Sequence, residues 1–248
     1  RGSSILPRSS ARLREEDVDG LLDYLAQLLP NIPTHSVQAE QRLAQKAREE
    51  AHRYLDQLTP EAQEAREQLE KARKFIFMEY FIVEHGVMWD TILEILERKA
   101  KEGVEVRFMY DGMCSIALLP YHYPKILEAK GIHCHAFAPI KPALSTYQNN
   151  RDHRKITVID GKVGFTGGYN LANEYFNYTN PYGQWKDTGI RLEGEAVRSL
   201  TITFLEMWNA VSEKDKNDTD FSQFLVQNDY QAKQNGFVQP YADIPMDD

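Results

Sequence analysis

A histidine and a lysine two residues apart, His153 and Lys155, carry the clearest chemical signal in the sequence. In an extended segment, side chains two residues apart point to the same face, so both heads can converge on one small anionic group. The pair Gly167 and Gly168 lets backbone approach a ligand closely, and Asn170 follows where a helix is expected to begin, a position that favours anions. A nucleophile, a fixed cation and neutral donors around one point are what phosphoryl transfer requires.

The whole pattern, H-x-K-x4-D-x6-G-G-x-N, is more informative than its parts. A lone H-x-K on a strand is usually a solvated face, and the Asp160-Gly161 turn is a common hairpin signal. The joint pattern specifies six positions at fixed spacing, which chance rarely produces. We therefore interpret residues 150–170 as the phosphate-binding edge of a site.

The preceding elements alternate between strand and helix patterns. An apolar run over residues 75–83, interrupted only by Glu79, predicts a buried strand. A helix, a strand, a second helix and a third strand are predicted in turn over residues 88–103, 104–110, 120–131 and 132–139. This order predicts parallel strands joined by crossover helices.

The later part of the chain predicts a hairpin and then a strand followed by a helix. Residues 153–159 and 162–166 should pair across the Asp160-Gly161 turn. A helix, a strand and a long final helix are predicted over residues 170–177, 187–194 and 195–211. The fold class is therefore α/β, with a mixed sheet of about six strands flanked by helices.

By composition the chain divides into three parts. Residues 1–70 form a helical and partly disordered extension, in which Pro60 suits the first turn of a helix. Residues 71–212 form the α/β domain that carries the site. Residues 213–248 are a polar tail typical of a linker.

Composition also restricts the classes of function. A net charge of −8 over 248 residues argues against broad nucleic-acid binding, which depends on a basic surface. The two cysteines, Cys114 and Cys134, lie in predicted regular elements, as expected of a reduced protein facing the cytoplasm. No apolar run approaches the ~20 residues of a membrane span.

Three stretches resemble the phospholipase D superfamily, and more specifically the bacterial cardiolipin synthases. They are FIFMEYFIVEHGVMWDTILEIL, NNRDHRKITVIDGKVGFTGGYNLANEYFN and WKDTGIRLEGEAVRSLTITFLEMWN. The similarity covers about residues 70–248 and implies a phospholipase D-like sheet. Members of this type carry two HxKxxxxD motifs and this chain carries one, so it resembles the N-terminal catalytic half-domain followed by the linker between the halves.

The resemblance implies a role for each motif residue. His153 would be the nucleophile that forms a phosphohistidine, or the general acid if the histidine of the other half attacks. Lys155 and Asn170 would bind phosphate oxygens. Asp187 would accept a hydrogen bond from the second ring nitrogen of His153 and fix its tautomer. Asp160 belongs to the motif, but we expect it to brace the hairpin.

Other residues leave alternatives open. Glu79 is either paired in the core or directed at the site. Gly112 stands where the family often has a second Asp, which leaves substrate contacts at that loop in question. His133 and His135 share a strand face, but no fourth ligand lies nearby, so we expect no metal and no cofactor. The aromatic residues between 169 and 185 either pack the core or line an entrance for a lipid headgroup.

The reaction implied by the resemblance is the transfer of a phosphatidyl group between two phosphatidylglycerols, which releases glycerol and gives cardiolipin. The expected partners are the phospholipid, a second half in the same full-length chain or in a second copy, and a membrane surface, with no nucleic acid. The full-length protein would lie on the cytoplasmic side, peripheral to or anchored in the cell membrane.

Two alternatives remain at this point. A homodimer could use the same motif as a phosphodiesterase or nuclease, with two copies of His153 meeting at a two-fold axis. The isolated half could also fold without a complete site and have no activity.

Overall fold

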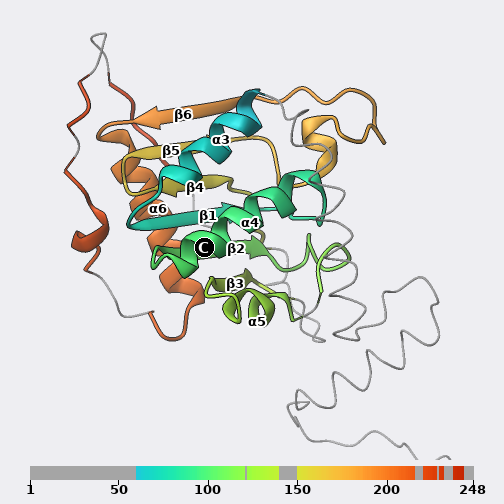
Figure 1. The fold of residues 1–248 in the computed structure, drawn as a ribbon, viewed down its shortest axis with the longest axis horizontal. Coiled ribbons are helices and arrows are strands. Elements are labelled where there is room, and N and C mark those ends of the chain that lie inside the picture. The colour runs from blue at the N-terminus through green and yellow to red at the C-terminus, as the bar shows by residue number, and fades with distance from the viewer. Residues whose placement is uncertain are drawn as a thin grey trace, which may run out of the picture. The chain divides into compact units, whose positions relative to one another are not determined.

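Six strands form one mixed sheet in the order β3-β2-β1-β4-β5-β6 (Figure 1). The computed structural model describes residues 60–120, 122–139, 150–215, 220–227, 229–231 and 237–242. Residues 1–59 of the extension predicted over residues 1–70 lie outside the described residues. The strands are β1 Phe75–Tyr80, β2 Glu105–Asp111, β3 His133–Phe137, β4 Ile156–Ile159, β5 Val163–Gly167 and β6 Gly189–Glu193.

Strand pairing changes from parallel to antiparallel at β1, the strand predicted to be buried. β1 runs parallel to β2, and β2 runs parallel to β3, as the alternating pattern predicted. On its other side β1 pairs antiparallel with β4, which continues antiparallel through β5 and β6. The predicted mixed α/β sheet of about six strands is therefore confirmed.

Helices cover both faces of the sheet (Figure 1). One face carries α3 (Pro60–Lys71), α4 (Val87–Lys101) and α5 (Tyr123–Glu128), and the other carries α6 (Ala196–Val211). Alternate residues of β1 reach the two cores: Met78 packs with α4, whereas Phe77 stacks on Phe204 of α6 at 4.9 Å between ring centroids. None of the described helices combines the length and apolar character needed to cross a bilayer.

The domain boundaries predicted after residue 70 and before residue 213 fall inside the packed domain. α3 begins at Pro60 as predicted, but its Leu69 is buried in the same core as α4. Beyond α6, Phe224 lies in the short helix η4 (Ser222–Phe224) and is 4% exposed. Its ring contacts Phe75 and Phe77 at 5.3 and 5.0 Å between centroids. Parts of the predicted extension and tail therefore complete the domain.

Some predicted elements are shorter than the sequence pattern indicated. β1 ends at Tyr80, α5 spans only six residues, and β4 begins at Ile156, three residues later than expected. The helix predicted over residues 170–177 is wrong, because only a 3-10 turn, η3 (Asn173–Phe176), forms there. Leu171 instead pairs its backbone with the segment after β1, donating to Ile82 O at 3.1 Å and accepting from Glu84 N at 3.0 Å.

Asp160 connects the hairpin turn to the beginning of β1. Its carboxylate accepts hydrogen bonds from the backbone N–H groups of Arg73, Lys74 and Phe75 at 2.8, 2.7 and 3.0 Å. Asp160 itself adopts a left-handed φ of 53°. Seven residues separate it from His153, which corresponds to roughly 20 Å of extended chain. This contact braces the fold at the end of β4 away from His153.

We predict that Asp160→Ala lowers the free energy of unfolding by about 2–3 kcal/mol, because the three N–H groups lose a charged acceptor and alanine disfavours the left-handed backbone. Asp160→Asn should cost less, because asparagine keeps one oxygen and tolerates that conformation. Urea unfolding followed by far-UV circular dichroism measures both variants. Wild-type stability in Asp160→Ala would contradict the bracing role.

Candidate active site

His153 and Lys155 meet at the ring of Phe81. The imidazole of His153 lies edge-on to that ring with 4.5 Å between centroids, and Lys155 Nζ lies 4.9 Å from the same centroid. Lys155 Nζ also donates a hydrogen bond to the carbonyl oxygen of His153 at 2.6 Å. The two side chains share a face as predicted, although they precede β4 instead of lying within it. The sequence offered no reason to single out Phe81, which follows β1 directly.

The neighbouring side chains, Asp152 and Arg154, form a buried ion cluster with Glu79. Arg154 contacts Glu79 Oε1 at 2.8 Å and Asp152 Oδ1 at 2.9 Å. Glu79 and Asp152 are 0% and 3% exposed. Burial, followed by the hydrogen bond and charge of Asp152, raises the pKa of Glu79 well above its ordinary value. Glu79 is therefore paired in the core, which is one of the two alternatives left by the sequence.

A second arginine fixes the loop after β2 beside the same segment. Arg151 contacts Asp111 Oδ1 and donates to the carbonyl oxygen of Ala138, both at 3.2 Å. Asp111 also accepts hydrogen bonds from the N–H groups of Met113 and Cys114 at 3.0 and 2.9 Å. These contacts hold the loop that begins at residue 112 against the segment that carries His153.

This loop contains Gly112, which is closely packed, and Cys114, whose thiol keeps its proton. A Cβ atom on Gly112 would lie 2.9 Å from Pro139 Cα, so a glycine suits the close packing at the position that departs from the family pattern. The thiol of Cys114 has a pKa raised to about 11 by burial and by Asp111, so it is protonated at neutral pH.

Burial sets the proton affinities of the two motif side chains. Lys155 is 4% exposed, and burial lowers its pKa to about 8, against the opposing charges of Asp152 and Asp187. The pKa of His153 is lowered by partial burial and then by Lys155, while Asp152 opposes the shift. Near neutral pH the pair therefore offers an unprotonated imidazole next to a charged ammonium group.

Asn170 is buried and binds the backbone segment next to Phe81. It is 3% exposed, and its Oδ1 accepts a hydrogen bond from the backbone N–H of Ile82 at 2.9 Å, which adjoins Phe81. The predicted position of Asn170 at a helix start is wrong, because η3 begins only at Asn173 and its N-cap residue is Ala172. The side chain holds the segment that carries Phe81.

Asp187 lies near Lys155 without a hydrogen bond to His153 in the described part of the chain. Its Oδ2 accepts from Trp185 Nε1 at 3.1 Å and its Oδ1 from the N–H of Thr188 at 2.8 Å. Its negative charge favours the protonated form of Lys155. The tautomer-fixing contact that the resemblance implied is absent from this arrangement.

The glycine pair makes room for the segment that contains Asp187. A Cβ atom on Gly168 would collide with the carboxylate of Asp187, and one on Gly167 would lie 2.5 Å from the carbonyl oxygen of Thr188. The glycines are therefore required by the close approach of residues 187–189, and the predicted approach of a ligand to their backbone stays a prediction.

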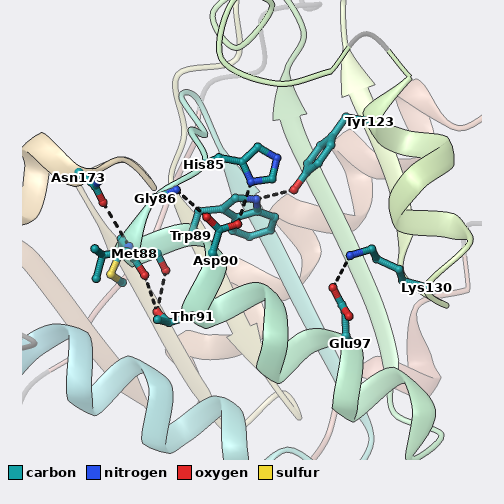
Figure 2. Close-up of polar contacts among 11 residues, drawn as sticks. His85, Gly86, Met88, Trp89, Asp90, Thr91, Glu97, Tyr123, Lys130 and Asn173 are labelled. Carbon is teal, nitrogen blue, oxygen red and sulfur yellow. Dashed lines mark hydrogen bonds and ion pairs between the residues drawn. The ribbon is translucent and has the colours of Figure 1, made fainter. Parts of the chain in front are cut away.

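A polar network fixes the loop between β1 and α4, which begins with Phe81 (Figure 2). Asp90, 1% exposed, accepts a hydrogen bond from the N–H of Gly86 at 2.8 Å and pairs with His85 Nδ1 at 2.8 Å. Trp89 Nε1 donates to the hydroxyl oxygen of Tyr123 at 2.5 Å, tying α4 to α5. The loop is thereby anchored at its helical end.

Comparisons with known proteins identify the family of the domain. A family model described as the phospholipase D-like domain of cardiolipin synthase matches residues 65–208. The chain is 39% identical over 145 residues to cardiolipin synthase 2 of Staphylococcus epidermidis, covering 58% of this chain and 30% of that protein. It is 44% identical over 142 residues to cardiolipin synthase of Alkalihalophilus pseudofirmus, covering 57% and 28%.

Two further similarities complete the comparison. An uncharacterized protein of Streptococcus mutans is 52% identical over 185 residues, covering 75% of this chain and 39% of that protein. Among solved structures, Nuc, a phospholipase D family member from Salmonella typhimurium, aligns with a TM-score of 0.45 and 18% identity, covering 62% of this chain and 92% of that chain.

The chain belongs to the phospholipase D superfamily, in the domain family of the cardiolipin synthases, because the family model matches more than half of it. It spans less than two fifths of the length of these curated relatives.

We predict that Arg154→Ala destabilises the domain by about 3–5 kcal/mol, because removing the arginine leaves the buried carboxylate of Asp152 uncompensated. Glu79→Gln should cost below about 1 kcal/mol, because glutamine resembles the protonated carboxyl that the raised pKa of Glu79 favours. Guanidinium unfolding curves compare the two variants. Equal losses in both would contradict the assignment of a proton to Glu79.

Proposed function

We propose that this chain provides one half of the active site of a phosphatidyltransferase that makes cardiolipin from two phosphatidylglycerols. The convergence of His153 and Lys155 on Phe81 carries the proposal, because it sets a nucleophile beside a cation at one point. Membership of the cardiolipin synthase domain family supports a phospholipid as the substrate. The net charge of −8 counts against a nucleic acid as the substrate.

In the first step, the neutral imidazole of His153 attacks the phosphorus of one phosphatidylglycerol. A P–N bond forms and the P–O bond to the headgroup glycerol breaks, and the departing glycerol oxygen takes a proton from the second motif. Lys155 sits where its charge stabilises the extra negative charge on the phosphoryl oxygens.

In the second step, a headgroup hydroxyl of another phosphatidylglycerol attacks the phosphohistidine. A P–O bond forms, the P–N bond breaks, and the hydroxyl proton returns to the second motif, which leaves cardiolipin and free His153. The second motif comes from the other half of a full-length chain or from a second copy. Because the substrates are lipids, we expect the reaction to take place at a membrane surface, and we propose its cytoplasmic side.

We predict a phosphatidyl adduct on His153 when the chain is incubated with short-chain phosphatidylglycerol and quenched in alkali, conditions that preserve phosphohistidine. Peptide mass spectrometry locates the adduct, and His153→Asn is the control without a nucleophile. The reaction is run with and without a cardiolipin synthase second half added in trans. If no adduct forms in either case, the proposed function fails.

We also predict a bell-shaped pH dependence for the rate of adduct formation. The rate should rise as His153 loses its proton at a pKa below the ordinary 6.5, because only the neutral ring attacks. It should fall as Lys155 loses its proton at about pH 8, because the stabilising charge disappears. Lys155→Arg should move the falling limb above about pH 12. A falling limb that stays near pH 8 in this variant would exclude Lys155 as its source.

A further inference from the structure

A cavity of about 450 Å³ adjoins the site through Asp187. It lies between η3, β6 and the segment that joins them, and its volume is within the range of small-ligand sites. Five of its thirteen lining residues are aromatic, among them Tyr169, Tyr175 and Trp185, and four are charged: Glu64, Lys186, Asp187 and Arg191. Most of these aromatic residues belong to the run for which the sequence left core packing and a headgroup entrance as alternatives.

The aromatic walls are fixed before any ligand binds. Both backbone groups of Trp185 bond to the side chain of Asn177, at 2.7 and 2.9 Å, and the Trp185 ring stands edge-on to Tyr175 with 4.7 Å between centroids. Tyr169 packs on Gly189, where a Cβ atom would lie 2.6 Å from Tyr169 Cε1. A cavity with preorganised walls binds at a smaller entropic cost.

The two cationic side chains of the cavity differ in whether they have an anionic partner. Arg191 pairs with Glu64 at 3.1 Å and with Glu193 at 2.5 Å. Lys186 is exposed and has no anionic partner among the residues that the structure describes. The cavity therefore presents an available cation one residue from Asp187, whose carboxylate acts on Lys155.

Such a cation would favour the second step of the proposed reaction. The attacking hydroxyl belongs to a glycerol whose own phosphodiester lies only a few bonds away, so this second anion must approach the phosphate already held near Lys155. A separate positive charge next to the site would offset the repulsion between the two phosphates.

We propose that this cavity binds the glycerol phosphodiester headgroup of the acceptor lipid. Lys186 contacts the phosphodiester, and the glycerol carbons lie against the rings of Trp185 and Tyr175. An acyl chain is a poorer occupant, because it would offer no polar partner to the ammonium of Lys186. The role as acceptor site rests on the proposed function, whereas headgroup binding can be measured independently.

Acrylamide quenching of tryptophan fluorescence tests the proposal with the whole chain. The chain has three tryptophans, and Trp89 and Trp208 are 0% and 2% exposed, so the quenchable emission comes from Trp185. The probes are glycerophosphoglycerol, which is the deacylated headgroup, and dihexanoyl phosphatidylglycerol below its micelle concentration. Both should protect Trp185 saturably, and glycerol or inorganic phosphate at the same concentrations should not.

Lys186→Gln should weaken the protection by at least about fivefold, because a charged hydrogen-bond donor to the phosphodiester is lost. Lys162→Gln is the matched control, since Lys162 is exposed in the turn between β4 and β5, at the other end of β5 from the cavity, and should bind as wild type. Unchanged binding by Lys186→Gln, or equal protection by inorganic phosphate, overturns the proposal.

Adduct formation on His153 separates this proposal from the proposed function. An adduct without protection of Trp185 overturns the cavity assignment alone. Protection without an adduct supports headgroup binding and overturns the transferase proposal together with the acceptor role.

Discussion

The buried contact of Arg154 with Glu79 and Asp152 is the constraint on which the site depends. Arg154 and Asp152 depend on each other, because either alone would leave a buried charge unpaired, and Glu79 adds a polar contact to Arg154. The contact holds residues 152 and 154 on the inner face of their segment. Since side chains alternate in extended chain, His153 and Lys155 are directed to the opposite face, where Phe81 lies.

The topology of the sheet explains why these groups meet at one edge. β1 and β2 are parallel, so Phe81, which follows β1, and Asp111, the last residue of β2 and the partner of Arg151, lie at the same edge of the sheet. β4 is antiparallel to β1, so the chain that enters β4 arrives at that edge with His153. The mixed sheet thus brings two strand ends and one strand start together at a single point.

Residue patterns predicted the sheet and the pairing of His153 with Lys155, because alternation and helical periodicity are local properties. The helix expected after Gly168 was wrong, because backbone pairing of Leu171 with Ile82 and Glu84 outweighed its local preference. The cluster of Arg154, Asp152 and Glu79 was not predicted from sequence, since Glu79 comes from β1, far from Arg154 in the chain. Only Glu79, as a carboxylate within an apolar run, gave a signal of it.

The contact of Asp160 with the chain before β1 has a consequence for synthesis on the ribosome. Its partners are separated from it by 85 to 87 residues, and β4, which covers one edge of β1, is made just before it. Until that point the aromatic strand FIFMEY has one open edge, a state prone to pairing with other nascent chains. The turn of the H-x-K-x4-D motif therefore also ends the interval in which the unfinished domain is vulnerable to aggregation.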